Sequence, residues 1–418
     1  MTLYGLAVRN VFRNGRRTAL NMIAIGLGVA LMVVCLGWVQ GYATYIYGAI
    51  IHFQTGSAQI LREGYEDQSA RFPLDLTVTG YRALRSQLLA QKGVTGVSGR
   101  LDFPARVIAP TGAVRLLGQG IDAESEREVS VLSKKIVAGS YLDGSPGILV
   151  GAAIARKLKV EVGAILQVSA TDRYGVENRV ALPLRGLFSF GYGAMDDSIA
   201  YLDLGSTQDL LDLGDEVTRV VLAGPLPTEV EQTARSYLRS HVGASAPADP
   251  AAKPLVAYGW QEFAKATVSG VHTDTYSFYV IAVILFALII VGILNSMSMS
   301  VHERHRELAA LRAIGFKRLT ARRLILLEAA TLAAVGTVAG FLVSAPIVYW
   351  LGIRGVDIAA YIPKDFPVPF GEIYHADYRL WHYVLSAALG VGASLAGALL
   401  PARRAARLPI AETIGAGI

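Results

Sequence analysis

The feature that most constrains this chain is an uncharged run, Ser277–Val301, that passes directly into a short, densely charged stretch, His302–Lys317. A membrane-spanning helix needs ~20 consecutive apolar residues, so the run is long enough to cross a bilayer. The charged stretch has a composition typical of a short surface helix, and another apolar run follows closely behind it. This arrangement suggests a device that pushes on a membrane helix from the cytoplasm.

The composition agrees with a membrane protein. Of the 418 residues, 53% are hydrophobic and 17% are charged, whereas about 25% are charged in a typical soluble protein. Residues 46–275 are of ordinary mixed polarity and carry 22 Lys/Arg against 25 Asp/Glu. The net charge of +6 therefore comes from segments that flank the apolar runs, which argues against a nucleic-acid partner. The one cysteine, Cys35, lies inside the first apolar run, so an intrachain disulfide and a cysteine metal site are excluded.

These runs predict an α-helical membrane fold of four transmembrane helices with a large extracytoplasmic α+β domain between the first and the second. In chain order the predicted segments are a cytoplasmic interfacial amphipathic helix (1–17), the first transmembrane helix and a stalk (18–45), the periplasmic α+β domain (46–275), the second transmembrane helix (276–301), a cytoplasmic coupling helix (302–323), the third transmembrane helix (324–353), a periplasmic loop (354–379), the fourth transmembrane helix (380–402) and a cytoplasmic tail (403–418).

The orientation of these helices is predicted from the lysine and arginine residues beside them. Cytoplasmic loops are rich in Lys and Arg. The segments before the first span, after the second and after the fourth contain 14 such residues, and the 354–379 loop contains three. We therefore expect both termini and the 302–323 segment in the cytoplasm, and the 46–275 domain on the opposite side of the membrane.

The N-terminal segment has an apolar stripe opposite a basic face. The first apolar run is too long for the 7–15 residue core of a cleaved signal peptide, so we interpret it as a membrane anchor. Before it, a stripe at helical spacing faces away from the arginines, which is typical of a helix lying in the membrane interface. The stripe consists of Leu3, Tyr4, Ala7, Val8, Val11 and Phe12.

The 46–275 domain shows alternating strand and helix patterns. Gly147–Leu166 predicts a strand, a helix, a turn and a strand, and Thr228–His241 predicts an amphipathic helix. Ala246–Pro254 is rich in proline and alanine and is interpreted as a linker. Gly259–Tyr276 then predicts a helix that leads into the second span, so the domain would be held on two stalks. Further short elements are expected at Ala113–Leu117, Ser198–Leu202, Ser206–Leu213 and Glu216–Leu222.

Catalytic and metal-binding patterns are not found in the sequence. It has no G-x-S-x-G elbow and no G-x-x-x-x-G-K-[ST] phosphate loop, so this chain cannot bind ATP through a P-loop. His302 and His305 are three residues apart, whereas the zinc motif H-E-x-x-H needs histidines four apart on one helix face. Asp196 and Asp197 are interpreted as an acidic turn, with a cation site as the alternative.

The charged stretch after the second span combines charge with an apolar stripe. Glu303 and Glu307 are four residues apart and would share a helix face with Arg306 nearby. Leu308, Leu311 and Ile314 would form a stripe suited to a groove, and Gly315 suits a helix C-terminus; a solvated loop is the alternative. Pairs of glycines four apart also suggest close packing between spans, at Gly37 and Gly41 and at Gly336 and Gly340, with a third small-residue run at Gly390–Ala398.

Six stretches of the sequence together resemble one family. NSMSMSVHERHRELAALRAIGFKRLTARRLILLEA after the second span and PARRAARLPIAETI after the fourth resemble the FtsX/MacB/lipoprotein-releasing class of ABC-transporter permeases. NVFRNGRRTALNMIAIGLGVAL resembles the first span of that class, and ILVGAAIARKLKVEVGAILQVSA, LRGLFSFG and AYLDLGSTQDLL resemble its MacB-like periplasmic core domain. The resemblance covers nearly the whole chain in the same order.

The resemblance implies a non-catalytic permease of the bacterial inner membrane. Two copies, or this chain and a sibling, would sit on a dimer of separate ABC ATPase subunits; ATP and Mg would be bound there and no cofactor by this chain. Membrane lipids and a periplasmic acceptor protein would be further partners. ATP-driven closure would rock the spans, a mode of action called mechanotransmission. The family pattern for coupling to the ATPase falls on Glu303, Arg304, Arg306, Glu307, Leu311, Arg312, Ala313 and Gly315, with Glu328 at the start of the third span.

The resemblance leaves the substrate open. The lipoprotein-releasing members have a tighter connection between the third and fourth spans than Arg354–Arg379, which here carries three prolines. Two hypotheses are therefore kept: extraction of a lipoprotein or lipid-like amphiphile, and MacB-like export of a drug or peptide. Regulation of a cell-wall hydrolase is a third hypothesis, ranked below these two. A membrane-anchored sensor would need a cytoplasmic output domain, and an intramembrane enzyme would need more ionisable residues than His382 in the fourth span.

Overall fold

The structure is a computed structural model that describes residues 3–13, 15–191, 196–241, 253–357 and 373–407. The chain divides into two compact units. The first comprises residues 1–45, 269–356 and 373–418 and contains the long helices; the second comprises residues 46–268 and 357–372 and contains the sheet. Pro363, Pro367 and Pro369, most of the 246–254 linker and nearly all of the C-terminal tail lie outside the described residues.

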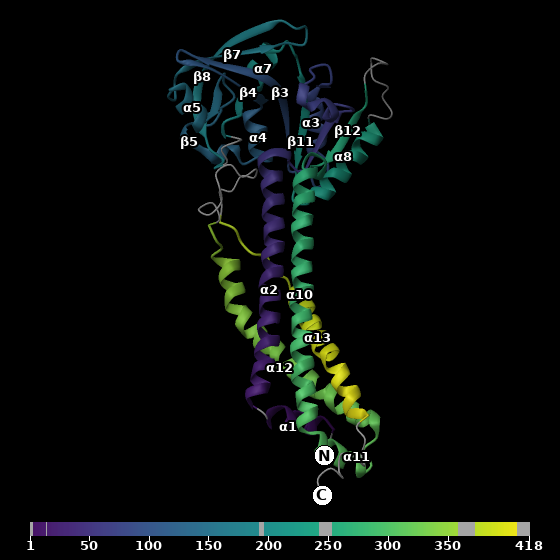
Figure 1. The fold of residues 1–418 in the computed structure, drawn as a ribbon. Coiled ribbons are helices and arrows are strands. Elements are labelled where there is room, and N and C mark those ends of the chain that lie inside the picture. Colours follow the sequence, from purple (N-terminus) through teal and green to yellow (C-terminus); the bar gives the residue numbers. More distant parts are fainter. Residues whose placement is uncertain (1–2, 14, 192–195, 242–252, 358–372, 408–418) are drawn as a thin grey trace. The chain divides into compact units, whose positions relative to one another are not determined.

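The first unit is built on four long helices (Figure 1). All four are long and apolar enough to cross a membrane, in agreement with the four predicted spans. They are α2 (Gly15–Ile50), α10 (Lys265–Glu303), α12 (Arg318–Ile353) and α13 (Leu380–Ala406). Helix α10 begins at Lys265, so it starts well before residue 276, where the second transmembrane helix was predicted to begin.

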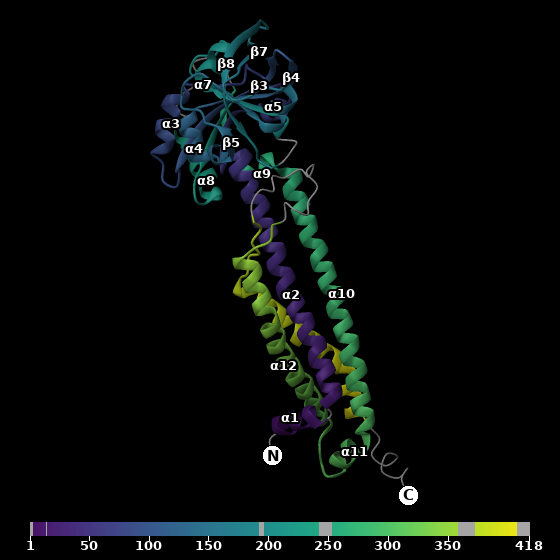
Figure 2. The same cartoon turned by 90° about the vertical axis from the view of Figure 1, so that its left-hand side faces the viewer.

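Two short helices lie at one end of this four-helix bundle (Figures 1 and 2). Helix α1 (Leu3–Arg13) packs Ala7 and Val11 into the bundle, while Tyr4 and Phe12 stay exposed. Helix α11 (His305–Ala313) connects α10 to α12. The apolar stripe of α1 therefore has two parts: Ala7 and Val11 pack inside the protein, and Tyr4 and Phe12 lie on its surface.

Glycines allow α2 and α12 to approach closely. A Cβ atom on Gly336 would lie 2.9 Å from the Ile25 side chain, and one on Gly340 would lie 2.6 Å from the carbonyl oxygen of Gly26. Such small-residue contacts let two membrane helices pack backbone against backbone. Within the Gly390–Ala398 run, Gly390 faces Val29 of α2 and Gly397 faces the Ile290 carbonyl of α10.

Gly37 and Gly41 pack against something other than a helix, and this corrects the prediction. A Cβ atom on Gly37 would collide with the Tyr378 ring, and one on Gly41 would lie 2.6 Å from the His375 carbonyl oxygen. The segment they face is the extended stretch that precedes α13. It is fixed by the isolated β-bridge between Val356 and Tyr374 and by the Tyr374 ring, whose centroid lies 4.6 Å from that of Trp38.

The second unit is an α+β domain around a ten-stranded mixed sheet. The strands run in the order β12-β1-β11-β3-β4-β9-β6-β8-β5, and β7 pairs with β3 and β8. Their bounds are β1 Ala58–Arg62, β3 Gly96–Ala109, β4 Gly112–Ile121, β5 Ile136–Gly139, β6 Ile148–Gly151, β7 Ile165–Thr171, β8 Glu177–Phe188, β9 Ile199–Asp203, β11 Arg219–Ala223 and β12 Leu255–Gly259. A separate two-stranded sheet pairs β2 (Val78–Thr79) with β10 (Glu216–Val217).

Helices cover the strands and close two main apolar cores. One core contains residues of α5 (Ala152–Leu158) and α7 (Leu204–Leu210) against the long strands β3, β7 and β8. The other contains residues of α3 (Tyr81–Leu89) and α8 (Pro227–His241) against β1, β11 and β12. The remaining short helices are α4 (Ala123–Val129), α9 (Trp260–Phe263), the π-helix Ile51–Thr55 and the 3-10 helices Glu66–Arg71 and Leu132–Lys135.

Most elements predicted in this domain are present. Gly147–Leu166 forms β6, α5 and the start of β7, and α8 occupies the predicted 228–241 helix. The predicted strand at Glu216–Leu222 is divided, because Val217 pairs with Val78 in the small sheet whereas Arg219 pairs with Arg100 in the large one. The predicted helix at Gly259–Tyr276 is likewise divided, at Ala264, into α9 and α10.

A buried ion pair ties the sheet to α4. The Arg100 guanidinium lies 2.7 Å from a carboxylate oxygen of Glu126, with side-chain exposures of 4% and 1%. The Ser98 hydroxyl donates to the other Glu126 oxygen at 2.8 Å, and Arg100 also donates to the Gln54 carbonyl. Burial alone would lower the pKa of Arg100, but the neighbouring charge and hydrogen bonds of Glu126 raise it above its ordinary value. Arg100 therefore stays charged inside the domain.

Candidate functional site

Helix α11 is separated from α10 by a break at Arg304. The backbone of Arg304 leaves the helical region, with φ −107° and ψ 17°. Glu303 is the last residue of α10, and α11 starts at His305. Glu303 therefore does not share a face of one helix with Glu307, contrary to the prediction, because the chain changes direction between them.

The C-terminus of α11 is closed by Gly315. Its φ of +110° lies in a region that residues with a Cβ atom avoid. The amide of Phe316 donates to the Leu311 carbonyl and the amide of Gly315 donates to the Arg312 carbonyl, both at 3.1 Å. This bond pattern is the Schellman motif, which satisfies the free carbonyls at a helix end. Gly315 thus turns the chain from α11 toward α12.

The predicted apolar stripe of α11 is divided between the interior and the surface. Leu308 is buried against Leu324, Ile325 and other residues of the bundle. Leu311 and Arg312 are half-buried, whereas Ile314 is 85% exposed. The exposed side chains around this helix are a mixture of charged and small residues, namely Glu303, Arg306, Glu307, Ala310 and Ala313. The stripe is therefore not one continuous surface for a groove; a narrower surface around Ile314 remains.

A chain of polar contacts joins α11 to α1 and α12. The Arg304 side chain contacts Glu328 of α12 at 3.0 Å through Nη1 and Glu307 of α11 at 3.0 Å through Nε. Asn10 of α1 donates to the same Glu328 oxygen at 2.7 Å, and Arg13 of α1 contacts Glu307 at 2.7 Å. We call these five residues the hub. It is formed by three segments of the chain that are up to 318 residues apart.

The hub has a buried half and an exposed half. The side chains of Arg304 and Glu328 are 8% and 4% exposed, whereas those of Arg13 and Glu307 are 51% and 48% exposed. The hydrogen bond from Arg13 is the largest of the effects that lower the pKa of Glu307, and Arg304 contributes in the same direction. Burial opposes the charge of Arg304, but Glu328 and Glu307 raise the pKa of its guanidinium. Arg304 and Glu307 therefore both favour their charged forms.

The histidine pair and the acidic pair, considered above as possible metal or cation ligands, make contacts within the protein. His302 and His305 stack with ring centroids 5.7 Å apart, and no cluster of three potential metal ligands occurs among the residues that the structure describes. Asp196 accepts hydrogen bonds from the Phe190 amide at 2.8 Å and from the Ser189 hydroxyl at 2.7 Å. These two bonds link Asp196 to the residues that follow β8.

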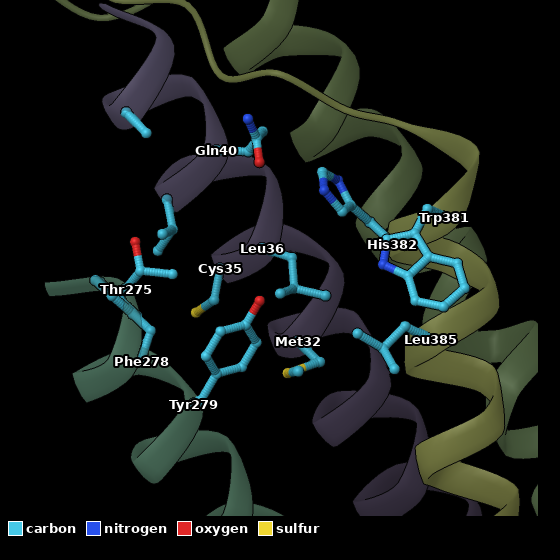
Figure 3. Close-up of a pocket in the computed structure, with 12 residues that line it drawn as sticks. Met32, Cys35, Leu36, Gln40, Thr275, Phe278, Tyr279, Trp381, His382 and Leu385 are labelled. Atoms are coloured by element: carbon cyan, nitrogen blue, oxygen red, sulfur yellow. The ribbon is translucent and has the colours of Figure 1, made fainter. Parts of the chain in front are cut away.

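A cavity of about 150 Å³ lies between α2, α10 and α13, near the ends of these helices that lie away from α11 (Figure 3). Met32, Leu36 and Leu385 form apolar parts of its wall, and the Tyr279 ring points toward Cys35 (Figure 3). Polar groups come from Gln40, Thr275 and His382. An amphiphilic lining of this kind is the usual character of a small-molecule pocket. Nothing in the sequence pattern indicated it, because its residues come from three distant helices.

Comparison with known proteins identifies the relatives of both parts of the chain. Residues 18–239 match the model of the MacB-like periplasmic core domain, and residues 279–410 match that of the FtsX-like permease C-terminal region. The chain is 24% identical to the lipoprotein-releasing system transmembrane protein LolC of Neisseria meningitidis, over 96% of this chain and 95% of that protein. It is 22% identical to LolE of Haemophilus influenzae, over 94% and 92%.

A third relative is a longer protein. The macrolide export ATP-binding/permease protein MacB of Bordetella avium is 24% identical over 95% of this chain but only 57% of its own length. Among solved structures, the periplasmic region of MacB from Actinobacillus actinomycetemcomitans matches 51% of this chain with 12% identity and a TM-score of 0.37. The family models cover the α+β domain and the helices that follow it, in the expected order. The chain therefore belongs to the FtsX-like permeases of ABC transporters that carry a MacB-like periplasmic core domain.

Proposed function

We propose that this chain is the membrane subunit that couples a separate ABC ATPase to the extraction of an amphiphilic substrate from the bacterial inner membrane. The observation that carries the proposal is α11, a short helix that joins two spans, exposes Ile314 and is bound to the bundle through the hub. The 418 residues of this chain contain no P-loop, so we propose that an ABC ATPase subunit supplies the motor. The lysine and arginine count favours a cytoplasmic position for α11, where such a motor acts.

The proposed contact with the ATPase is the surface around Ile314. Ile314 is 85% exposed and follows the exposed residues Ala310 and Ala313, with the exposed Arg306 further back on α11. A small apolar centre with charged residues around it is the usual composition of an interface. Leu311 and Arg312 lie half-buried at the edge of this surface, and Gly315 fixes where it ends. Glu307 and Arg304 would act from behind this surface, through the hub.

The proposed substrate is a lipoprotein or a lipid-like molecule. Two of the relatives carry the name of lipoprotein-releasing systems and match this chain over nearly their whole length. Export of a drug or peptide is the second candidate, favoured by the match to a macrolide exporter. The two differ in what the complex retains when it is held without ATP, which mass spectrometry of the purified complex identifies as acylated protein or as a smaller molecule.

The coupling role is tested by co-purification of the tagged chain from its native membrane. We expect an ABC ATPase to co-purify with the wild-type chain. The variant Ile314→Arg places a charge in the centre of the proposed interface, so we expect the ATPase yield to fall by roughly tenfold, as for a central interface residue. Ile373→Arg is the matched control, since Ile373 is also exposed in the first unit but precedes Tyr374, which pairs with Val356 beyond the end of α12 that lies away from α11. Equal ATPase yields from Ile314→Arg and the wild-type chain would contradict the proposal.

A further inference from the structure

The break at Arg304 means that α11 is not a simple extension of α10. A continuous helix would transmit a push on α11 directly along α10. Here the backbone is interrupted between Glu303 and His305, and the side chain at the break points to a different helix. Arg304 is bound to Glu328 of α12, where both side chains are nearly excluded from solvent.

The remaining contacts of the hub extend the same connection. Asn10 donates to the Glu328 oxygen that Arg304 also contacts, so α1 and α11 share one acceptor on α12. Arg13 and Glu307 form a second link between α1 and α11. Apolar packing supports these links, because Ala7 of α1, Leu308 of α11 and Leu324 of α12 belong to one buried cluster, which also contains Val301 near the end of α10 and two alanines of α13. The polar contacts of the hub thus join α1, α11 and α12, and α10 reaches this place only through its last turn.

Helix α10 is the least enclosed of the four spans. Only 22% of its most apolar stretch is buried within the described chain, compared with 44% for α12. Its outward side carries large apolar residues along its length, among them Val283, Ile284 and Leu288. A helix that has fewer contacts with the rest of its chain loses fewer of them when its angle changes.

Together these contacts lead us to propose that Glu328 is the positioning residue through which α11 moves the bundle. In this arrangement, which rests on the proposed coupling to an ATPase, α11, α1 and α12 move as one body because Arg304 and Glu328 hold them together. Helix α10 changes its angle relative to that body at Arg304. A charged pair is suited to this role because a buried carboxylate without its partner is strongly disfavoured. The two side chains therefore stay in contact when α11 is pushed.

The first test measures how firmly the Arg304–Glu328 contact holds α11 and α1 to α12, in the purified permease without its ATPase. Hydrogen–deuterium exchange of the α11 and α1 amides reports how often these helices open. In Glu328→Gln, Arg304 keeps Glu307 but loses its buried charged partner on α12. We expect exchange in both helices to become roughly tenfold faster, with α10 changed little. Asp377→Asn is the matched control, because it removes a carboxylate from the exposed Arg379 pair of the same unit. If exchange in α11 were unchanged in Glu328→Gln, the proposal that Glu328 holds α11 to α12 would be overturned, whether or not an ATPase binds.

The second test measures transmission in the complex with the ATPase. Spin labels at the exposed positions Tyr276 of α10 and Tyr349 of α12, in a Cys35→Ser background, report the angle between the two helices. We expect a non-hydrolysable ATP analogue to change this distance in the wild-type complex and to leave it unchanged in Glu328→Gln, although the ATPase still co-purifies. A full nucleotide-dependent change in Glu328→Gln would overturn the proposal. Loss of co-purification from wild type would instead refute the proposed function.

A milder variant guards against a failure to fold. Arg304→Lys keeps the positive charge, but a single ammonium group cannot bind Glu328 and Glu307 in the two-sided way that the guanidinium does. We expect it to fold, to bind the ATPase and to show a reduced nucleotide-dependent distance change. If the nucleotide-dependent distance change were as large in Arg304→Lys as in wild type, only the charge at Arg304 would matter. That result would contradict the proposal that Arg304 must bind Glu328 and Glu307 at the same time.

Discussion

The buried pair of Arg100 and Glu126 allows one prediction to be worked out in detail. The substitution Glu126→Gln keeps the size and shape of the side chain and removes its charge. Arg100 then remains inside the α+β domain with the Gln54 carbonyl as its main remaining partner. The Ser98 hydroxyl also loses a charged acceptor.

The expected loss of stability follows from burial. Breaking a buried pair by removing one partner costs about 3–5 kcal/mol, and the exposures of 4% and 1% place this pair in that class. We take the lower end, about 3 kcal/mol, because the amide oxygen of glutamine still accepts a hydrogen bond. A unit of about 240 residues unfolds with an entropy of roughly 0.5 kcal/mol per kelvin. The melting temperature should therefore fall by about 6 °C.

The assay is thermal unfolding of the full chain in detergent, followed by near-UV circular dichroism. Glu177→Gln is the matched control, because it makes the same change in an Arg–Glu pair of the same domain, 3.3 Å apart, in which both side chains are more than half exposed. We expect that control to shift the melting temperature by less than about 2 °C, as exposed pairs contribute little. If Glu126→Gln melted together with the control, the reasoning from burial would be refuted.

Three further predictions concern the helical unit. Gly340→Val should destabilise the seam between α2 and α12 by about 1–3 kcal/mol in an unfolding titration, whereas Gly392→Val should not, because no atom lies within 4 Å of the position its Cβ would take. Because the pKa of Glu307 is lowered, its contribution to stability is present above its unfolded pKa, near 4.3, and is lost as the pH falls through the folded value. The stability difference between wild type and Glu307→Gln should therefore vanish in acid. A difference that persists in acid would be evidence against the Arg13 contact. Filling the cavity with Ala43→Phe should slow thiol labelling of Cys35, and an unchanged rate would mean that the probe reaches Cys35 by another route.

The long spans could be predicted from the sequence because the hydrophobic signal is local and strong. The helix before the second span was also predicted, as Gly259–Tyr276, although residues 265–276 include Lys265 and Asp274 and their composition is not that of a membrane helix. Its division at Ala264 into α9 and α10 was not predicted. Threonine and serine side chains in this part bond to carbonyls four residues earlier, as Thr273 does to Ser269, and so remain compatible with a helix.

The hub could be predicted only in part. Arg304, Glu307 and Glu328 were singled out by a family resemblance, but their mutual contacts and those of Asn10 depend on how α1 folds back onto the bundle. Likewise, the spacing of Leu308 and Ile314 shows that they could share a face. It does not show that one would be buried against the bundle and the other exposed. Which side of a short helix is covered is decided by tertiary packing, and periodicity alone carries no information about it.

The position of β1 in the sheet has a consequence for how this protein is made. Its two neighbours, β11 and β12, are both far along the chain: Ala58 pairs with Leu222 on one side and with Gly259 on the other. At ~5–20 residues per second, a ribosome needs roughly 10–30 s to supply the first of these partners. During that time the apolar strand Ala58–Leu61 has neither neighbour, so the nascent domain passes through a stage in which its first strand must be shielded from other chains. The order of strands in the finished sheet thus sets the period in which a newly made copy is most open to aggregation.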